Sequence, residues 1–428
     1  MDTKKLYSLF ASSRGVSIDT RNLVDGQIFF SLRGEKYNGN DFALEALDKG
    51  ACYSVIDDKK ILYKNQSQNL IYVKDSLKAF QELSCYHRSH YDTKVIGVTG
   101  SNGKTTTKNL IYSILSQKYN VIKTKGNLNN HIGVPLSLFD INKKVDIAII
   151  EMGANHIGEI ERLCNIAMPD IGLITNYGKA HLEGFGGFEG VIQGKTEMFD
   201  YLTKNYGHII LNNDDELQVA NCRGDLALTY GNKPDSEFVY NYIEKDNKLI
   251  IKTENYEFKS NIYGDYNLSN LAVSITIGKF LDLKNDEIQK GLDLFQNDSN
   301  RSEIIKLGTN KIYLDAYNAN PSSIKAAILN FDKEVSDKKI LVLGDMFELG
   351  EYSDNEHQNI VDLIKNKNYE KIYLVGNNFF KCNTKEQHIQ KFKSLDELSE
   401  SINFNSLNSM NILIKGSRGI GLEKLLNY

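Results

Sequence analysis

The chain has 428 residues, a length that predicts about three compact domains. Hydrophobic residues make up 41% and charged residues 25%, which is the balance of a globular protein. The formal net charge of −4 provides no positive field that would attract nucleic acid or an anionic membrane. No apolar run approaches the roughly 18 residues that a membrane-spanning helix needs.

The chain begins with a polar segment that lacks the apolar core of a signal peptide, and its five cysteines lie far apart without CxxC pairing. Unpaired thiols are typical of a reducing compartment. We therefore expect a cytoplasmic protein with no nucleic-acid partner and no transmembrane segment. We also expect a monomer.

Residues 1–92 predict a small mixed α/β domain. Apolar runs at 27–32 and 70–73 favour strands, and residues 76–91 place Leu77, Phe80 and Leu83 at helical spacing.

From residue 94 a pattern of strand, turn and helix repeats along the chain. Continuous apolar strands alternating with helices predict a parallel sheet covered on both faces, in a central domain over residues 93–297. Polar and apolar residues alternate over 235–265, which predicts an antiparallel hairpin. The predicted strands are 94–98, 120–123, 145–151 and 171–175, and the predicted helices are 104–115, 157–166, 268–281 and 285–294.

A second series of strands and helices predicts a Rossmann-like C-terminal domain over residues 298–428. Its predicted strands are 311–314, 339–343, 371–375 and 411–414. The expected fold class is therefore α/β with three domains: a small mixed N-terminal domain, a central domain with a parallel sheet, and this C-terminal domain.

The segment VIGVTGSNGKTTTK at 95–108 carries the clearest chemistry. A strand leads to a Gly-rich turn and then to a helix N-terminus, where backbone amides and the helix dipole favour phosphate. Gly100 and Gly103 allow positive φ, Lys104 would reach the β- and γ-phosphates, and the Thr105 hydroxyl would bind Mg²⁺. The first glycine of the strict phosphate-loop pattern is displaced, because Val98 stands in its place.

Two acidic or polar strand ends follow. Glu151 ends an apolar strand, and Asn176 and His181 come after the next one. Because ligands bind beyond the carboxyl ends of parallel strands, Glu151 and His181 are candidate Mg²⁺ ligands. Spacing alone makes Lys195, on a helix at 188–200, a solvated surface lysine.

Taken together, these segments resemble the Mur ligase family, which makes the precursor of peptidoglycan. The resemblance covers nearly the whole chain, and the motifs come in the family's order. They are GVTGSNGKTTT, EMGANHIGEI, TNYGKAHLEGFGG, GKTEMF, GDYNLSN, RSEI and DAYNANP.

Four segments are similar to the family member that joins UDP-N-acetylmuramoyl-tripeptide to D-Ala-D-Ala. They are GNLNNHIGVP, DAYNANPSS, LGDMFELG and KGSRGIGLE. The resemblance implies that ATP phosphorylates the peptide carboxylate, that the dipeptide amine attacks the acyl phosphate, and that phosphate leaves. A sister ligase that adds the third peptide residue, diaminopimelate or lysine, is the alternative.

The resemblance also implies roles for individual residues and the use of ATP, a pair of Mg²⁺ ions and a carbamylated Lys195. The implied catalytic residues are Lys104, Lys195, His181 and Arg301. The implied ATP-binding residues are Gly100, Ser101, Asn102, Gly103, Lys104, Thr105, Thr106, Asn267, Asn270, Arg301 and Asp315. The implied substrate-binding residues are Thr20, Arg21, Ser31, Asn129, Asn130, Tyr317 and Asn318. The implied metal ligands are Thr105, Glu151, His181 and Lys195.

Three positions depart from the family pattern. Tyr266 stands where a histidine is frequent, and Asn38 and Asn40 stand where an aspartate and a histidine are usual. Outside the family, a phosphate-loop switch or motor is the competing class. We find no N-K-x-D guanine signature in the place where a GTPase would carry one.

Overall fold

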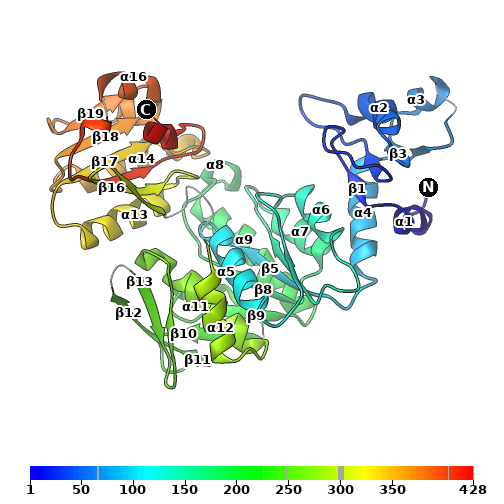
Figure 1. Ribbon diagram of the computed structural model, residues 1–428, viewed down its shortest axis with the longest axis horizontal. Helices are drawn as coiled ribbons and strands as arrows, with labels where there is room; N and C mark the ends of the chain where they lie inside the picture. The colour runs from blue at the N-terminus through cyan, green and yellow to red at the C-terminus, as the bar shows by residue number, and fades with distance from the viewer. Residues whose placement is uncertain (65–66, 225, 246–247, 297–302, 403, 428) are drawn as a thin grey trace. The chain divides into compact units, whose positions relative to one another are not determined.

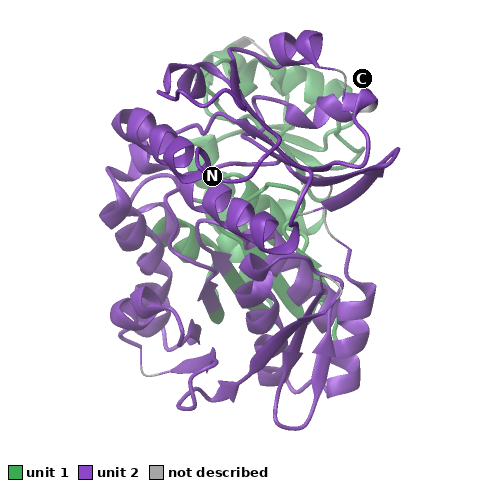
Figure 2. Ribbon diagram, turned by 90° about the vertical axis from the view of Figure 1, so that its left-hand side faces the viewer, with its two compact units in different colours: residues 1–97, 119–153, 161–171 green, residues 98–118, 154–160, 172–428 purple. Residues whose placement is uncertain are grey.

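The structure is a computed structural model that describes residues 1–64, 67–224, 226–245, 248–296, 303–402 and 404–427 (Figure 1). The chain forms two compact units (Figure 2). The first comprises residues 1–97, 119–153 and 161–171, and the second comprises residues 98–118, 154–160 and 172–428.

The N-terminal region forms a four-stranded parallel sheet in the order β1-β2-β3-β4. Its core includes Phe30 and Phe80, both fully buried, with ring centroids 5.1 Å apart. The two predicted strands and the predicted helix are present. The elements are α1 (Thr3–Ala11), β1 (Val16–Ser17), β2 (Ile28–Phe30), η1 (Gly39–Phe42), α2 (Ala43–Asp48), β3 (Tyr53–Ile56), α3 (Lys59–Lys64), β4 (Leu70–Tyr72) and α4 (Ser76–Arg88).

The central sheet has seven strands in the order β11-β10-β9-β8-β5-β7-β6. Its strands β7 and β8 are buried along their whole length, as continuous apolar sequence predicts for a sheet covered on both faces. The strands are β5 (Lys94–Thr99), β6 (Val121–Lys123), β7 (Ile147–Glu151), β8 (Ile171–Ile174), β9 (His208–Asn212), β10 (Ala227–Gly231) and β11 (Phe238–Val239). The accompanying helices are α5 (Lys104–Leu115), α6 (Gly133–Leu138), α7 (Glu159–Ala167), α8 (Leu182–Phe185), α9 (Phe188–Lys204), α10 (Glu216–Asn221), η2 (Asp265–Asn267), α11 (Leu268–Phe280) and α12 (Asn285–Leu294).

The predicted hairpin at 235–265 is larger than expected. Its start, β11, belongs to the central sheet, and three antiparallel strands follow, β12 (Asn241–Lys245), β13 (Lys248–Lys252) and β14 (Glu257–Lys259). Phe258 on β14 pairs with Ile251 and is fully buried, so burial of this ring stabilises the pairing of β14 with β13. A three-residue strand with one apolar side chain is too short to be recognised by alternation.

The C-terminal domain is a six-stranded sheet in the order β15-β16-β20-β17-β18-β19, and all neighbours except the antiparallel pair β15 and β16 run parallel. The strands are β15 (Glu303–Leu307), β16 (Asn310–Asp315), β17 (Lys339–Gly344), β18 (Lys371–Val375), β19 (Ile389–Phe392) and β20 (Asn411–Lys415). The helices are α13 (Pro321–Glu334), η3 (Gly350–Tyr352), α14 (Ser353–Ile364), α15 (Asn377–Lys381), α16 (Leu395–Ser401), η4 (Phe404–Ser406) and η5 (Leu422–Asn427).

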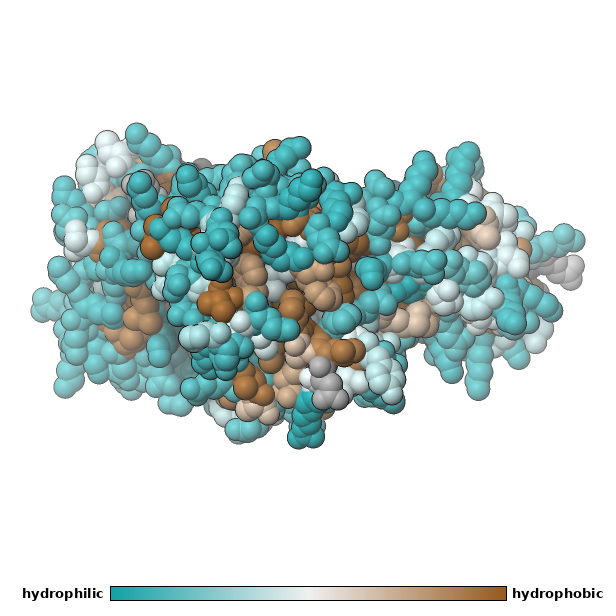
Figure 3. All heavy atoms as spheres, turned by 90° about the horizontal axis from the view of Figure 1, so that it is seen from below, coloured by the Kyte–Doolittle hydropathy of each residue, from teal (hydrophilic) through white to brown (hydrophobic). Residues whose placement is uncertain are grey.

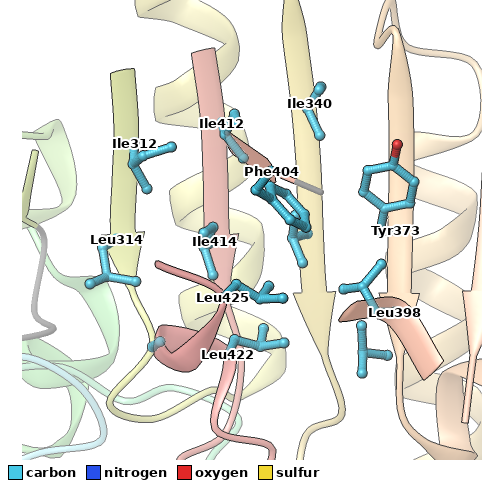
Figure 4. Packing of buried hydrophobic residues seen from close by; sticks show 13 residues of the cluster. Ile312, Leu314, Ile340, Tyr373, Leu398, Phe404, Ile412, Ile414, Leu422 and Leu425 are labelled. Atoms are coloured by element: carbon cyan, nitrogen blue, oxygen red, sulfur yellow. The ribbon is translucent and has the colours of Figure 1, made fainter. Parts of the chain in front are cut away.

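One face of this sheet is covered by α16, η4 and η5 (Figure 4). Alternate residues of β16 and β20, such as Ile312 and Ile412, meet Leu422 and Leu425 of η5 in one buried cluster. The strands are thereby held in register, and the last residues of β16 and β20, Asp315 and Lys415, lie opposite each other at the carboxyl edge.

The face of the molecule seen in Figure 3 is covered mostly by hydrophilic residues. Within the described ranges, no helix has both the length and the hydropathy to cross a bilayer.

Candidate active site

The phosphate loop is a tight turn between β5 and α5. Gly100 has φ 137° and Gly103 has φ 80°, so both adopt the left-handed half of conformational space that glycine tolerates. Gly103 is the residue before the first turn of α5, which begins at Lys104 as predicted. A Cβ atom at Gly100 would lie 1.9 Å from the Thr175 hydroxyl oxygen, so the turn also needs glycine for space.

We expect Gly100→Ala to lower the free energy of unfolding by about 2 kcal/mol or more, because left-handed strain adds to overpacking. Gly308→Ala is the matched control, since Gly308 also has positive φ but a Cβ there meets nothing within 4 Å. Its expected cost is about 1 kcal/mol from backbone strain alone. Urea denaturation of both variants measures the difference, and equal losses would contradict the steric argument.

The loop is braced by the segment that follows β8. The Asn102 amide donates to Asn176 Oδ1 at 3.1 Å, and the Ser101 amide donates to the Asn176 carbonyl at 3.0 Å. The Ser101 hydroxyl donates to the Gly178 carbonyl at 2.8 Å. Two loop amides that the sequence assigned to nucleotide binding are thus engaged within the protein. The N–H groups that we expect to bind phosphate therefore lie mainly in the first turn of α5.

Two lysines of this region differ in burial, because Lys104 is half-buried and Lys195 is fully buried. Lys104 Nζ donates to the carbonyls of Gly100 at 2.6 Å and Ser101 at 3.2 Å. Lys195 on α9 is 1% exposed, and its Nζ lies 5.2 Å from the centroid of the Phe185 ring. Spacing alone made Lys195 a surface residue, and that prediction was wrong, because α9 turns this position toward the interior.

Burial holds the pKa of Lys195 well below its ordinary value, and the charge of Lys104 lowers the pKa further. Glu159 and Glu197 act in the opposite direction without overcoming the burial. The lowered pKa favours the neutral form of the Lys195 amine, which is the form that reacts as a nucleophile.

Asn267 and Asn270, predicted to contact adenine, are both buried. The Asn270 amide nitrogen donates to Asn267 Oδ1 at 3.0 Å, and Asn270 Oδ1 accepts from the Thr107 hydroxyl at 3.1 Å. The Asn267 amide nitrogen donates to the Tyr263 carbonyl. These contacts connect both asparagines to each other and to α5, the helix that follows the phosphate loop. The adenine role of both residues stays a prediction.

Side chains of the C-terminal domain contact both the phosphate loop and the segment that follows β8. Asn320, which caps α13, donates from Nδ2 to Asn102 Oδ1 at 2.7 Å. Lys179 forms an ion pair with Glu356 at 2.5 Å. His181, with φ 55°, pairs through Nδ1 with Glu348, and the hydrogen bond from His181 lowers the pKa of the Glu348 carboxyl group.

Asp315 ends β16, as the sequence predicted. Lys415 Nζ donates to Asp315 Oδ2 at 2.5 Å and to the Asn318 carbonyl at 3.4 Å. Lys415 is 1% exposed, so this ion pair is shielded from solvent on the lysine side. Arg301, assigned to the γ-phosphate, lies outside the described residues.

The first unit holds Glu151, Asn129 and Asn130, which were predicted as a metal ligand and as substrate contacts. Glu151 at the end of β7 is 2% exposed, its Oε1 accepts from Asn129 Nδ2 at 2.8 Å, and its amide donates to the Thr124 hydroxyl. Asn130 Oδ1 accepts from the amides of Ile132 and Gly133 at the start of α6. Asn129 therefore orients a candidate metal ligand. The side-chain oxygen of Asn130 instead stabilises the backbone at the start of α6.

The three predicted contacts to the UDP end have different environments. The Thr20 hydroxyl donates to Glu45 at 3.0 Å, and exposed Arg21 pairs with Asp19 at 2.7 Å. Ser31 is fully buried, and its hydroxyl has no hydrogen-bond partner within the described residues. A buried hydroxyl without a partner is costly, which marks Ser31 as the one of the three that a ligand would satisfy.

No three His, Cys, Asp or Glu side chains of the described ranges gather as a metal site. The predicted set contains only two such residues, Glu151 and His181, beside Thr105 and Lys195. Glu151 belongs to the first unit and the other three to the second. The complete set therefore stays a prediction.

A Gly-rich turn between a strand of a parallel sheet and a helix N-terminus, a buried lysine on α9 and a Rossmann-like C-terminal domain are together typical of nucleotide-dependent α/β enzymes. Three family models match in chain order: the Mur ligase catalytic domain over residues 13–88, the middle domain over 98–278, and the glutamate ligase domain over 300–418. The chain belongs to the Mur ligase family and has its three-domain architecture.

The relatives narrow the resemblance further. The chain is 34% identical over 423 residues to the UDP-N-acetylmuramoyl-tripeptide–D-alanyl-D-alanine ligase of Bacillus subtilis, covering 96% of this chain and 92% of that protein. It is 33% identical to the ligase of the same name from Escherichia coli, again covering 96% and 92%.

Solved structures agree. Crystal structure I of MurF from Acinetobacter baumannii superposes with a TM-score of 0.87 at 26% identity, covering 99% of this chain and 97% of that one. MurF ligase from Thermotoga maritima, solved in complex with ADP, gives 0.84 at 26% identity, covering 97% and 96%.

Proposed function

We propose that this chain is an ATP-dependent ligase that joins D-alanyl-D-alanine to UDP-N-acetylmuramoyl-tripeptide in peptidoglycan synthesis. The observation that carries the proposal is the phosphate loop together with the buried Lys195. It is supported by relatives of that name, which this chain matches over nearly their whole length. The alternative, a sister ligase that adds the third peptide residue, is not favoured. We also infer that the protein acts as a monomer in the cytoplasm, which analytical ultracentrifugation and cell fractionation would test.

The reaction needs charge neutralisation and positioning more than covalent help from the protein. The tripeptide carboxylate attacks the γ-phosphorus, the bond to the β-phosphate oxygen breaks, and ADP leaves. The dipeptide amine then attacks the acyl carbon, loses a proton, and expels phosphate. Lys104 would neutralise the transferred phosphoryl group, with Arg301 as its proposed partner.

Asp315 would orient the ribose, and Lys415 supports that role because its Nζ donates to Asp315 Oδ2 and fixes the position of the carboxylate. Gly103, Thr105 and Thr106 would present the first turn of α5 to the phosphates. Asn267 and Asn270 would border the adenine. Substrate contacts are proposed for Thr20, Arg21, Ser31, Asn129, Asn130, Tyr317 and Asn318.

Mg²⁺ would be held by Thr105, Glu151, His181 and a carbamylated Lys195. The residues fit this role chemically: His181 Nδ1 contacts the Glu348 carboxylate, which is how proteins commonly orient a metal-binding imidazole through its second nitrogen. When bound, the ion would offset phosphate charge. Carbamylation would turn Lys195 from a cation into an anion, which removes its repulsion of the metal.

The test is phosphate release from purified protein with ATP, across a matrix of UDP-peptides and amines, with product masses measured. We expect release only when UDP-N-acetylmuramoyl-tripeptide and D-Ala-D-Ala are both present. Release with the UDP-dipeptide plus diaminopimelate or lysine would instead establish the sister activity. Comparing tripeptides that end in diaminopimelate and in lysine would identify the third residue.

A further inference from the structure

The loop after β20 carries an arginine whose charge nothing in the described structure neutralises. Arg418 is exposed, and no described acidic side chain forms an ion pair with it. Its guanidinium carbon lies 5.5 Å from the centroid of the Tyr317 ring, in the loop after β16. Stacking on an aromatic face fixes the plane of a guanidinium and leaves its edge N–H groups available.

This arginine lies where an open α/β sheet binds its ligands. From β16 the chain passes through α13 to β17, and β20 lies between these two strands. Such a change of direction in strand order opens a crevice beyond the carboxyl ends. The register aligns Lys415 with Asp315 on one side and with Leu343 on the other, so the loops that follow these strands share that edge.

The two cations at this edge have different surroundings. Lys415 is buried and its charge is matched by Asp315. Arg418 has an aromatic platform but no anion among the described residues. Between them Ser417 is 3% exposed, and its hydroxyl has no hydrogen-bond partner in the described chain. The edge therefore offers one unmatched planar cation and one unsatisfied hydroxyl, a combination that suits a small anion with a neighbouring polar group.

We propose that Arg418, held on Tyr317, binds the terminal carboxylate of the acceptor dipeptide. The inference rests on the proposed function and deepens it, because it identifies what selects the acceptor. D-Ala-D-Ala has one amine, which reacts, and one carboxylate, which does not. The planar fork of arginine matches a carboxylate with two parallel hydrogen bonds, and gripping the unreactive end leaves the amine free to attack.

The test compares D-Ala-D-Ala with D-alanyl-D-alaninamide, which has the same amine and a neutral end. In the unchanged protein we expect KM for the amide to exceed KM for the dipeptide by about 10- to 100-fold, the value of hydrogen bonds to a charged group. Arg418→Met should raise KM for the dipeptide by a similar factor, leave KM for the amide unchanged, and leave KM for ATP and the UDP-tripeptide unchanged. Arg418→Lys, which keeps the charge without the fork, should fall between.

Lys385→Met is the matched control, since Lys385 is an exposed cation of the same domain and its loss should change none of these constants. Thermal unfolding of each variant checks folding. Equal rises in KM for dipeptide and amide, or no rise at all, would overturn the carboxylate assignment while the ligase activity stands. If the unchanged protein makes no product with D-Ala-D-Ala, the proposed function itself fails, so the two failures are separable.

Discussion

Lys104→Ala should lower ATP-dependent phosphate release by about 10²–10³-fold, the usual cost of removing one donor to charge that develops in a transition state. The lysine stands at the first position of α5, and its ammonium already lies among the loop carbonyls of Gly100 and Ser101. Steady-state phosphate release with saturating tripeptide and dipeptide measures the effect, and the loss should appear in kcat.

Lys94→Ala is the control for this change, because Lys94 is an exposed lysine at the other end of β5. Its removal should leave kcat within a factor of about two, as expected for a surface substitution away from the site. Full activity of Lys104→Ala would remove the proposed mechanism. Unfolding of the variant is excluded by comparing its thermal midpoint with that of the unchanged protein.

Activity should depend on dissolved CO₂ through Lys195. Burial lowers the pKa of its amine and so favours the neutral form, which can add to the carbon of CO₂ and releases one proton as the N–C bond forms. We expect activity to fall in degassed buffer and to return with bicarbonate. With ¹³C-bicarbonate, one carbamate resonance should appear and should be missing in Lys195→Met.

Lys339→Met is the matched control for the resonance. Lys339 is also buried, but its Nζ is engaged in an ion pair with Asp332 at 2.8 Å. That variant should keep the carbamate signal. Activity that is indifferent to bicarbonate, together with a spectrum lacking the resonance, would show that Lys195 acts as an unmodified amine.

The lowered pKa of Lys195 also determines how the free energy of unfolding changes with pH. The unfolded chain binds this proton up to about pH 10.4, whereas the folded chain releases it at lower pH. Between the two pKa values the unfolded state binds more protons, so the free energy of unfolding rises with pH in that window. Urea denaturation in CO₂-free buffer should show a shallower rise in Lys195→Met.

Sequence reasoning identified the phosphate loop because its determinants are local. The apolar run of β5, the two glycines and the start of α5 at Lys104 are all contained within residues 94–115. Helix α12 and strand β18 were likewise predicted to the residue, because each is a strongly periodic or continuously apolar segment with clear ends. Short elements such as α2, β11 and β14 gave no such signal.

The contacts that sequence reasoning missed at the site all join residues that are far apart in the chain. Asn176 occupies the amides of Ser101 and Asn102, Glu348 contacts His181, and Asn320 reaches Asn102. Each was visible as part of a motif, but a motif does not say which side chain it will meet. Lys195 also shows that local pattern does not predict tertiary packing. Its position on the helix predicted an exposed side chain, but the fold buries it.

The sequence by itself determined the order of domains, the phosphate loop, and the polar residues at strand ends, because hydrophobic periodicity and turn chemistry depend on neighbours along the chain. Tertiary structure alone decided which charges are matched and which remain: Lys415 is neutralised by Asp315, whereas Arg418 is left on Tyr317. Electrostatic environment and burial depend on residues brought together from distant positions, and no local pattern contains that information.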